Sequence, residues 1–445
     1  MNRSSWFRVG FVALVAVFAV VPATALGKKK ETVEVCKHGC EFRTIQDAVD
    51  GTGKNATINV HPGKYKEGVR VTGAKHDGLT IQGTKGNAKK VILEGKNAKD
   101  PDGQPANNGI EGDGVDGMRV LNLWARNYLA NGIFIHDCKG YLMKNLRASF
   151  NRAYGLFAFD CIGGRMTESV GYGQGDSAYY VGETPVQSKP KWTKLDHLDG
   201  HENVLGYSGT NSKYVKITKS NFYNNGAGVV PNTLDSERFE PTATGIIEKN
   251  NIFWNNFNYF LPNSPVPTVS SGLGEPIPGV VIQYPTGVGV VLLGADGWIV
   301  RDNQIFGNFK AGAWTISDPF NTDHNAISIN NQFLDNQMGR GGTDTNQVDF
   351  FNDGSGYGNC FQGNVSSTFD PGSAPDSNLY PSCPAPAPPI SGTGTDSADS
   401  SQLGDLVNYV AATPPETQEC QWAKHDHPKF EKFKPLTITP GPTCP

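Results

Sequence analysis

The chain has 445 residues, of which 37% are hydrophobic and 18% are charged, so it is long enough for a large core and too apolar for a disordered protein. Glycine (53) and asparagine (37) are abundant, and both residues interrupt helices and adopt positive φ, which argues against a helical bundle or a coiled coil. The net charge of −4 argues against a nucleic-acid partner.

Residues 1–25 have the pattern of a cleaved export signal. Arg3 and Arg8 precede a short apolar run, Phe11 to Val21, and Ala23-Thr24-Ala25 supplies small residues at a cleavage site. The alternative is an uncleaved membrane anchor, but the run is shorter than the ~20 residues that span a bilayer. We therefore expect a secreted protein, extracellular or periplasmic, with no membrane span after removal of the signal.

An even number of cysteines in an exported chain predicts disulfides. The eight cysteines are Cys36, Cys40, Cys138, Cys161, Cys360, Cys383, Cys420 and Cys444. Many connectivities are possible, and the local order favours pairing each cysteine with the next one along the chain. A zinc cluster is the alternative, which the wide and unmatched spacings argue against.

A period of 23 residues runs through the sequence. Gly132-Ile133-Phe134-Ile135-His136-Asp137-Cys138 and Gly155-Leu156-Phe157-Ala158-Phe159-Asp160-Cys161 share glycine, phenylalanine, aspartate and cysteine, and Gly289 and Gly312 begin similar segments with the same spacing. A period of this length predicts a solenoid. One kind of solenoid, the leucine-rich repeat, is not supported, because the sequence has no regularly spaced leucines. Short β-branched runs separated by asparagine or glycine instead predict coils of three short strands.

The solenoid makes local predictions. Cys138 should lie above Cys161, because neighbouring strands are ~4.8 Å apart, within disulfide range. Asparagine suits the tight turns, and its amide can bond to the asparagine of the next coil. A short helix over residues 44–49, with Thr44 as N-cap, should cover the first coil, followed by a strand at residues 57–60.

The sequence resembles the secreted right-handed parallel β-helix proteins of the pectin-lyase-like superfamily. The similar segments are residues 42–49, 58–67 and 79–83 and the asparagine-rich coils, and the resemblance covers roughly residues 36–366. It implies an all-β, right-handed parallel β-helix solenoid with a short N-terminal capping helix. The superfamily includes polysaccharide lyases, glycoside hydrolases, uronate epimerases, tailspikes, metal-related proteins and adhesins, so the fold does not select a reaction.

We expect four segments: the signal at 1–25, the β-helix at 31–370, a Pro/Ser/Gly-rich linker at 371–401 and a tail at 402–445 that carries the last cysteine pair. Residues 183–203, 230–244 and 262–286 depart from the period and are interpreted as loops that leave the coil and frame a binding site.

Two aspartates occupy equivalent positions on neighbouring coils. Asp137 and Asp160 would repel each other, which predicts a coupled titration or a calcium site, and calcium is the one cofactor that the sequence suggests. Paired carboxylates also carry out glycoside hydrolysis. The alternative is that each aspartate bonds to local N–H groups at a turn.

His197 and His201 are four residues apart, beside Asp196, Asp199 and Glu202. Such a cluster can bind zinc or copper. However, Asp199-Gly200 is typical of a turn, and a solvated loop is the simpler interpretation.

Arg238 lies beside Asp235 and Glu237 in another insertion. A lyase needs a base that removes the proton α to a uronate carboxylate and a cation that neutralises that carboxylate, and calcium held by these acids together with Arg238 would serve. Asp176 and Glu183 join this face if the insertions cluster. A surface group of ion pairs is the alternative.

Aromatic residues recur on the repeated strand. They are Phe134, Phe157, Phe159, Tyr179 and Trp314. If they face outward, they form a platform for sugar rings. The alternative is that loops or the tail cover them.

The sequence therefore leaves three functions open. The first is a polysaccharide lyase or glycoside hydrolase that uses Asp176, Glu183, His197, His201, Asp235 and Arg238. The second is a non-catalytic surface or matrix protein that binds glycan through the aromatic residues. The third is a periplasmic metal-related protein. In each case we expect a monomer, and in the first two the partner is a polysaccharide or cell-wall glycan.

Overall fold

The computed structural model describes residues 31–385 except 85, 236, 257–285, 309, 318–326, 341–343, 354–355, 366–368 and 371–379. The predicted signal, the tail and the Cys420–Cys444 pair lie outside these residues.

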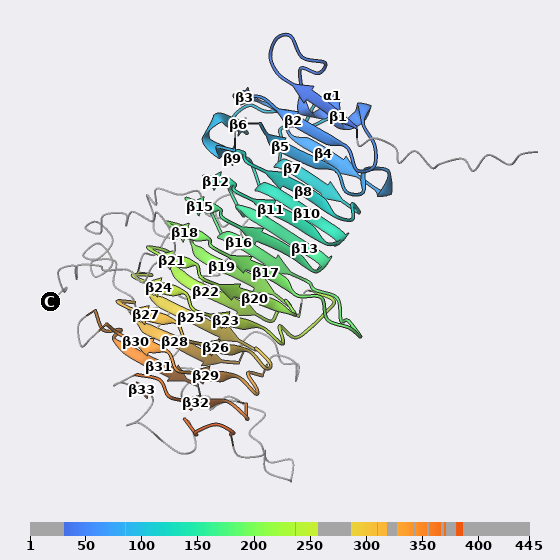
Figure 1. The fold of residues 1–445 in the computed structure, drawn as a ribbon. Coiled ribbons are helices and arrows are strands. Elements are labelled where there is room, and N and C mark those ends of the chain that lie inside the picture. The colour runs from blue at the N-terminus through green and yellow to red at the C-terminus, as the bar shows by residue number, and fades with distance from the viewer. Residues whose placement is uncertain are drawn as a thin grey trace, which may run out of the picture. The chain divides into compact units, whose positions relative to one another are not determined.

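Three parallel sheets wind along the described chain, and each coil contributes one short strand to each sheet (Figure 1). One sheet is 12-stranded: β1 (Thr32–Val35), β2 (Thr57–Val60), β5 (Thr80–Gly83), β8 (Met118–Leu121), β11 (Tyr141–Lys144), β14 (Gly164–Thr167), β17 (Thr193–Asp196), β20 (Val215–Thr218), β23 (Ile246–Glu248), β26 (Ile299–Arg301), β29 (Gln332–Leu334) and β32 (Cys360–Gln362). One is 11-stranded: β4 (Val69–Thr72), β7 (Asn108–Asp113), β10 (Asn131–Lys139), β13 (Leu156–Ile162), β16 (Ser177–Gly182), β19 (Leu205–Thr210), β22 (Ala227–Asn232), β25 (Val288–Leu293), β28 (Ala311–Ile316), β31 (Val348–Asn352) and β33 (Phe369–Asp370). One is 10-stranded: β3 (Gly63–Tyr65), β6 (Val91–Glu94), β9 (Trp124–Arg126), β12 (Arg147–Ser149), β15 (Val170–Tyr172), β18 (Asp199–His201), β21 (Asn221–Tyr223), β24 (Asn251–Phe253), β27 (Gln304–Phe306) and β30 (Gln337–Met338).

The strand register confirms the predicted period. Ile133 pairs with Leu156 and Val288 with Ala311, both 23 residues apart. Parallel strands that are joined by such crossovers wind in the right-handed sense. The all-β, right-handed parallel β-helix predicted from the sequence is therefore the fold of the described chain.

A short helix covers the first coil, as predicted. Helix α1 (Ile45–Gly51) begins after Thr44, whose hydroxyl accepts a hydrogen bond from the backbone N–H of Asp47 at 3.0 Å. Its apolar side faces the core, with Ala48 and Val49 buried. The helix lies at the blue end of the stack and covers the sheet edge that the first coil would otherwise expose (Figure 1). Two 3₁₀ turns, Ala74–His76 and Ala88–Lys90, lie in the next coils.

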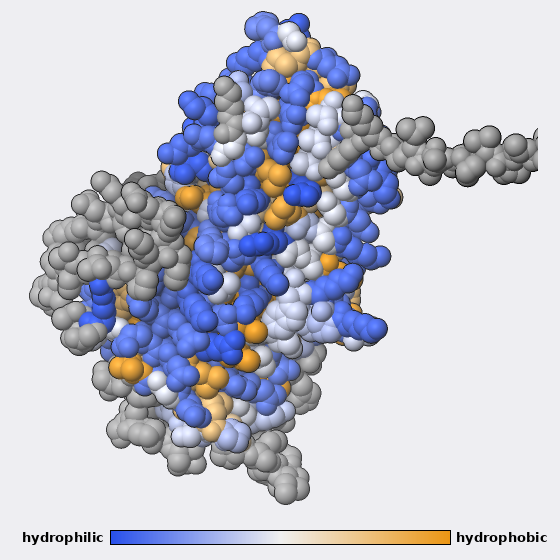
Figure 2. Space-filling view, in the orientation of Figure 1, coloured by the Kyte–Doolittle hydropathy of each residue, from blue (hydrophilic) through white to orange (hydrophobic). Residues whose placement is uncertain are grey.

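Side chains alternate between the core and the outside along each strand. In β10, Ile133 and Ile135 are fully buried, whereas Phe134 and His136 lie on the outward face. The face seen in Figure 2 is mostly hydrophilic, with scattered hydrophobic residues. The apolar residues thus form a continuous core inside the coils.

The recurring glycine at the start of the repeat has a steric cause. A Cβ on Gly109 would lie 2.5 Å from the carbonyl oxygen of Gly132, and one on Gly132 would lie 2.6 Å from that of Gly155. Neighbouring coils therefore approach too closely at this corner for any larger side chain.

Buried amides form a ladder along the solenoid, as the asparagine-rich coils predict. The side-chain N–H of Asn203 donates to the Oδ1 of Asn225, and Asn225 donates to Asn255, each over 3.0 Å. The same bonds continue to Asn308 and Asn346. The ladder satisfies polar groups at the turns that no strand pairing reaches.

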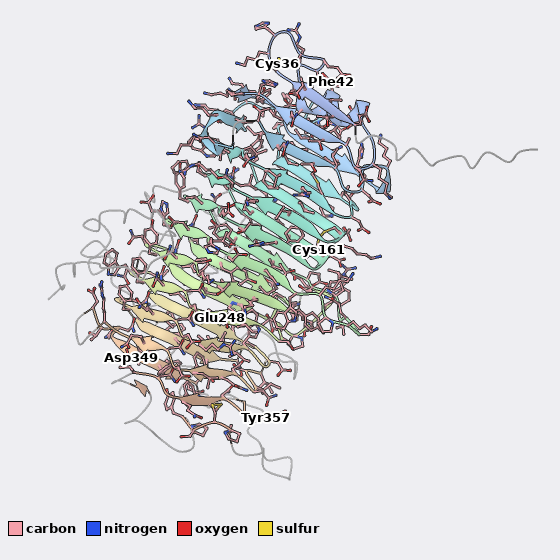
Figure 3. All side chains as sticks on the ribbon, viewed as in Figure 1. Cys36, Phe42, Cys161, Glu248, Asp349 and Tyr357 are labelled. Atoms are coloured by element: carbon pink, nitrogen blue, oxygen red, sulfur yellow. A yellow bond between two sulfur atoms is a disulfide. The ribbon has the colours of Figure 1, made fainter. Side chains whose placement is uncertain are left out.

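The three predicted disulfides within the described residues are present. Cys138 and Cys161, with Cα atoms 4.6 Å apart, join β10 to β13. Cys36–Cys40 closes a short loop, and Cys360–Cys383 joins the last described residues to β32. Figure 3 shows Cys36 at the capped end and Cys161 partway along the stack.

Loss of the Cys138–Cys161 disulfide should weaken the fold. The double serine variant is expected to lose ~3 kcal/mol of unfolding free energy, because the bridge closes a loop of 23 residues in the unfolded chain. The double serine variant at Cys36 and Cys40, which are four residues apart, should lose only about 2 kcal/mol. Urea unfolding measures both, and equal losses would contradict the loop-length argument.

The described helices are too short and too polar to cross a membrane.

Candidate functional site

Three acidic residues follow one another near the C-terminal ends of successive strands of the 11-stranded sheet. Asp137, Asp160 and Glu183 take equivalent places on successive coils, and each has a left-handed backbone with φ between 50° and 52°. The prediction that Asp137 and Asp160 lie one above the other is confirmed. We call these three residues the acidic column. Stacked carboxylates repel one another, so the charged groups beside the acidic column determine its protonation and its chemistry.

Arg238 joins two members of the column. Its guanidinium forms an ion pair with Asp160, and its Nε donates to Glu183 Oε1 at 3.2 Å. The backbone N–H of Arg238 donates to the same Glu183 oxygen at 2.8 Å. Glu183 is almost fully buried, whereas the Arg238 side chain is 64% exposed. The structure therefore brings together two of the predicted catalytic residues, Glu183 and Arg238, and adds Asp160.

The Asp137 and Asp160 carboxyls interact directly. Burial raises the pKa of Asp160, Arg238 opposes this, and the hydrogen-bonded Asp137 carboxyl adds to the rise. The Asp137 side chain is 57% exposed. Asp160 therefore holds its proton at a higher pH than a free aspartate does, and the Asp137 carboxyl beside it is exposed to solvent.

His136 supplies the counter-ion on the other side. Its Nδ1 lies 2.7 Å from Asp137 Oδ2 and 3.7 Å from Asp113 Oδ1, and its Nε2 lies 3.6 Å from Glu111 Oε1. Burial lowers the pKa of His136, but the surrounding carboxylates outweigh it and raise the pKa to about 8. The ring is therefore a cation at neutral pH. Asp113, His136 and Asp137 are also the one group in the described chain with metal-ligand spacing.

Aromatic rings lie beside the acidic column on the outward face. Phe134 stacks on Phe157 with centroids 4.3 Å apart and on His136 at 4.4 Å, while Phe159 meets Phe157 edge to face. Both faces of the Phe134 ring are therefore occupied by other rings. The predicted aromatic surface is present here, but Phe134 offers an edge rather than a face.

Two residues assigned to that surface do not belong to it. Tyr179 pairs in register with Leu156 and points into the core, where its hydroxyl lies 2.7 Å from the Ser169 carbonyl oxygen. Tyr180 is the outward residue of this coil, in register with Phe157. Trp314 belongs to a separate buried cluster and is only 1% exposed. Neither Tyr179 nor Trp314 presents a ring to a ligand.

The other acidic candidates lie apart. Asp176 is buried just before β16 begins, at the opposite end of that strand from Glu183, roughly 20 Å away along the backbone. Asp235 is exposed, whereas the nearby Glu237 adjoins Glu183. The expected arrangement, in which Asp235 and Glu237 flank Arg238 as cation ligands, is replaced by bonds from Arg238 to Asp160 and Glu183.

The two histidines of the predicted metal cluster lie on different elements, a corner and a strand. His197 follows β17 and bonds to Asp196 at 2.7 Å. His201 ends β18, where its ring stacks between Tyr172 and Tyr223 at 5.3 and 5.2 Å. The segment is two strands and a corner rather than a loop, and within the described residues it forms no three-ligand group.

A pH effect on stability arises in this second region. Burial raises the pKa of Asp199 to about 7. The folded state therefore binds this proton more tightly than the unfolded chain, and stability falls as the pH rises from about 4 to 7. Asp199→Asn should remove that loss and stabilise the protein at pH 8 by about 4 kcal/mol, with little change at pH 4. Urea unfolding at both pH values tests this, with Asp302→Asn at an exposed corner as the control.

Two residues of the site were not found from the sequence. His136 carries a signal, since it stands beside Asp137 in the repeat. Lys213 carries none, because its role depends on where residues 237–241 lie. Lys213 Nζ donates to the carbonyl oxygens of Phe239 and, at 2.6 Å, Pro241. Burial lowers its pKa to about 8.

No protein-family model matches the sequence, and no curated protein matches it. Among solved structures, the chain is similar to the A-module of the Azotobacter vinelandii mannuronan C-5 epimerase AlgE4, with 15% identity, a TM-score of 0.48, and coverage of 73% of this chain and 83% of that one. It is also similar to pectate lyase Pel9A (13% identity, TM-score 0.39, 80% and 82% coverage) and to the Dettilon tailspike protein (12%, 0.43, 76% and 60%). Identities this low concern the fold alone. The three parallel sheets themselves establish a parallel β-helix.

Proposed function

We propose that this protein is an exported enzyme that cleaves an acidic polysaccharide at Asp137, Asp160 and Arg238. One observation carries the proposal: the carboxyls of Asp137 and Asp160, on neighbouring coils, lie close enough to interact directly beside an exposed guanidinium. The three disulfides support export, because such bonds persist in oxidising compartments.

The chemistry that fits this set is β-elimination at a uronate. A base takes the proton α to the sugar carboxylate, the C–O bond to the leaving sugar breaks as the C=C bond forms, and a proton is given to the leaving oxygen. A pair that shares one proton can accept the first proton and give the second. Arg238 would bind the uronate carboxylate, which a guanidinium does in a bidentate manner.

The distance between the carboxyls favours elimination over hydrolysis. Retaining glycosidases hold their two carboxyls ~5 Å apart and inverting ones hold them farther apart, with the sugar bond between them. Asp137 and Asp160 are close enough to share a hydrogen bond, which leaves no room for a glycosidic bond.

The outward face of the same sheet offers a path for a sugar chain. Phe134 and Phe159 adjoin the aspartates, and Glu111 connects His136 to a pocket of about 270 Å³ that residues of β4, β7 and the segment at Asp100 line. Arg70, Asp100 and Asn108 line this pocket with groups that bond to hydroxyls. Several sugar units would therefore contact the sheet on one side of the cleaved bond.

Calcium at Asp137 and Asp160, which the sequence suggests, is not part of the proposal. Arg238 and His136 already neutralise these carboxylates, and a nitrogen donor is a poor ligand for calcium. Adding calcium or a chelator should therefore change the rate less than about twofold. Loss of activity in chelator, restored by calcium, would contradict this.

A panel of uronate-containing and neutral glycans tests the proposal. Elimination gives an unsaturated product that absorbs ultraviolet light, together with new reducing ends, from a uronate polymer. Reducing ends without unsaturation would indicate hydrolysis. Binding without any product across the panel would overturn the enzyme proposal and favour the glycan-binding alternative.

A further inference from the structure

Glu183 belongs to the acidic column but cannot touch a substrate. It is 1% exposed and lies beneath Arg238, to which it offers one carboxylate oxygen for two hydrogen bonds. Its role in the proposed reaction is therefore indirect: it fixes where Arg238 lies.

The second oxygen of Glu183 faces another carboxyl. The Oε2 atoms of Glu183 and Glu237 are both buried, and neither has a hydrogen-bond partner when both groups are ionised. The two side chains are close enough to bond to each other through one proton. Two buried carboxylates without that proton would repel each other.

Other charged groups face this pair. Lys213 lies on the neighbouring coil and binds the backbone of residues 237–241, and Glu240 acts on Lys213. Asp160 shares Arg238 with Glu183, and the Tyr180 hydroxyl lies near Glu237. Asp296 also acts on Lys213. Two cations, Lys213 and Arg238, thus face five carboxylates, and one shared proton reduces the excess negative charge.

We propose that Glu183 and Glu237 share one proton and together hold Arg238 against Asp160, so that loss of this proton releases Arg238 from the site. This inference rests on the proposed function only for its effect on catalysis. We call this restraint of Arg238 by the two glutamates the hold. It is a property of residues 237–241 and is measurable without a substrate.

Amide hydrogen exchange of residues 237–240 tests the hold, because the Arg238 N–H donates to Glu183. Burial and the Glu183 charge raise the pKa of Glu237 to about 7. In the wild type, protection corrected for intrinsic exchange should therefore fall about tenfold for each pH unit above that value. Glu237→Gln keeps a hydrogen donor that cannot ionise, so its protection should stay constant with pH.

Glu168→Gln is the matched control, because Glu168 is a glutamate with a left-handed backbone at a coil corner, but it is half-exposed and paired with Lys144. It should behave like the wild type. Equal pH dependence in the wild type and Glu237→Gln, or none in the wild type, would overturn the inference.

The activity profile links the hold to catalysis. The kcat/KM of the wild type should decline above about pH 7, whereas Glu237→Gln should keep its activity for at least one further pH unit. If exchange changes as expected but no glycan is cleaved, the hold stands and the proposed function fails. If glycan is cleaved with the same pH profile in both proteins, the effect on catalysis is overturned.

Discussion

Asp160→Asn is expected to lower kcat on a uronate polymer by about 10²- to 10⁴-fold, the range for loss of a general acid or base. The amide has the same shape as the carboxyl, but it can neither hold the shared proton nor pair with the Arg238 charge. KM should rise less than kcat falls, because Arg238 stays exposed and Glu183 still holds it. Steady-state kinetics measures kcat and KM, and a thermal melt shows that the variant is folded.

The control for this variant is Asp335→Asn. Asp335 is also an aspartate with a left-handed backbone at a coil corner, but it is exposed and lies on another side of the solenoid. Its kcat should match the wild type. An active Asp160→Asn variant with wild-type kcat would exclude the Asp137–Asp160 pair as the acid–base group.

The sequence predicted the architecture because a solenoid repeats its constraints. The same corner needs glycine at Gly132 and Gly155, and the same stack brings Cys138 to Cys161, so each constraint appears in the sequence once per coil. The N-cap at Thr44 is local and equally readable. These features need no knowledge of contacts distant in the sequence.

The prediction that Tyr179 faces outward was wrong, because it allowed this coil to depart by one residue from the period of 23. A strict offset of 23 from Phe157 gives Tyr180, which is the observed partner. A one-residue shift moves every side chain of a strand to the opposite face. Likewise, residues 183–203 were interpreted as an insertion, whereas residues 193–196 and 199–201 form β17 and β18. The register of Gly164 with Thr193, 29 residues on, shows that only six extra residues leave the coil before β17.

The site was predicted only as far as the period reaches. Asp137 and Asp160 are one coil apart, so their contact follows from the repeat. Arg238 reaches Asp160 and Glu183 from 78 and 55 residues away. That contact depends on the path of the chain after β22, where the repeat is interrupted and the sequence carries no spacing rule.

The amide ladder gives the second large expected effect. Asn225 is fully buried, and its side chain accepts bonds from the backbone and side-chain N–H groups of Asn203 and donates to Gly200 and Asn255. Asn225→Ala leaves the Asn203 backbone N–H and the Gly200 carbonyl without these partners. Each orphaned group costs about 1–3 kcal/mol, so a loss of about 3–5 kcal/mol of unfolding free energy is expected.

Gln82→Ala separates this effect from the loss of any stacked amide. Gln82 also bonds to the amide of the preceding coil, Asn59, at 2.8 Å, but it is half-buried on the outward side, where water replaces the lost bond. Gln82→Ala should therefore lose less than about 1 kcal/mol of unfolding free energy. Urea unfolding compares the two variants. If they lose the same free energy, the ladder stabilises the coils only through its individual bonds, and the argument that it satisfies buried backbone groups at the corners fails.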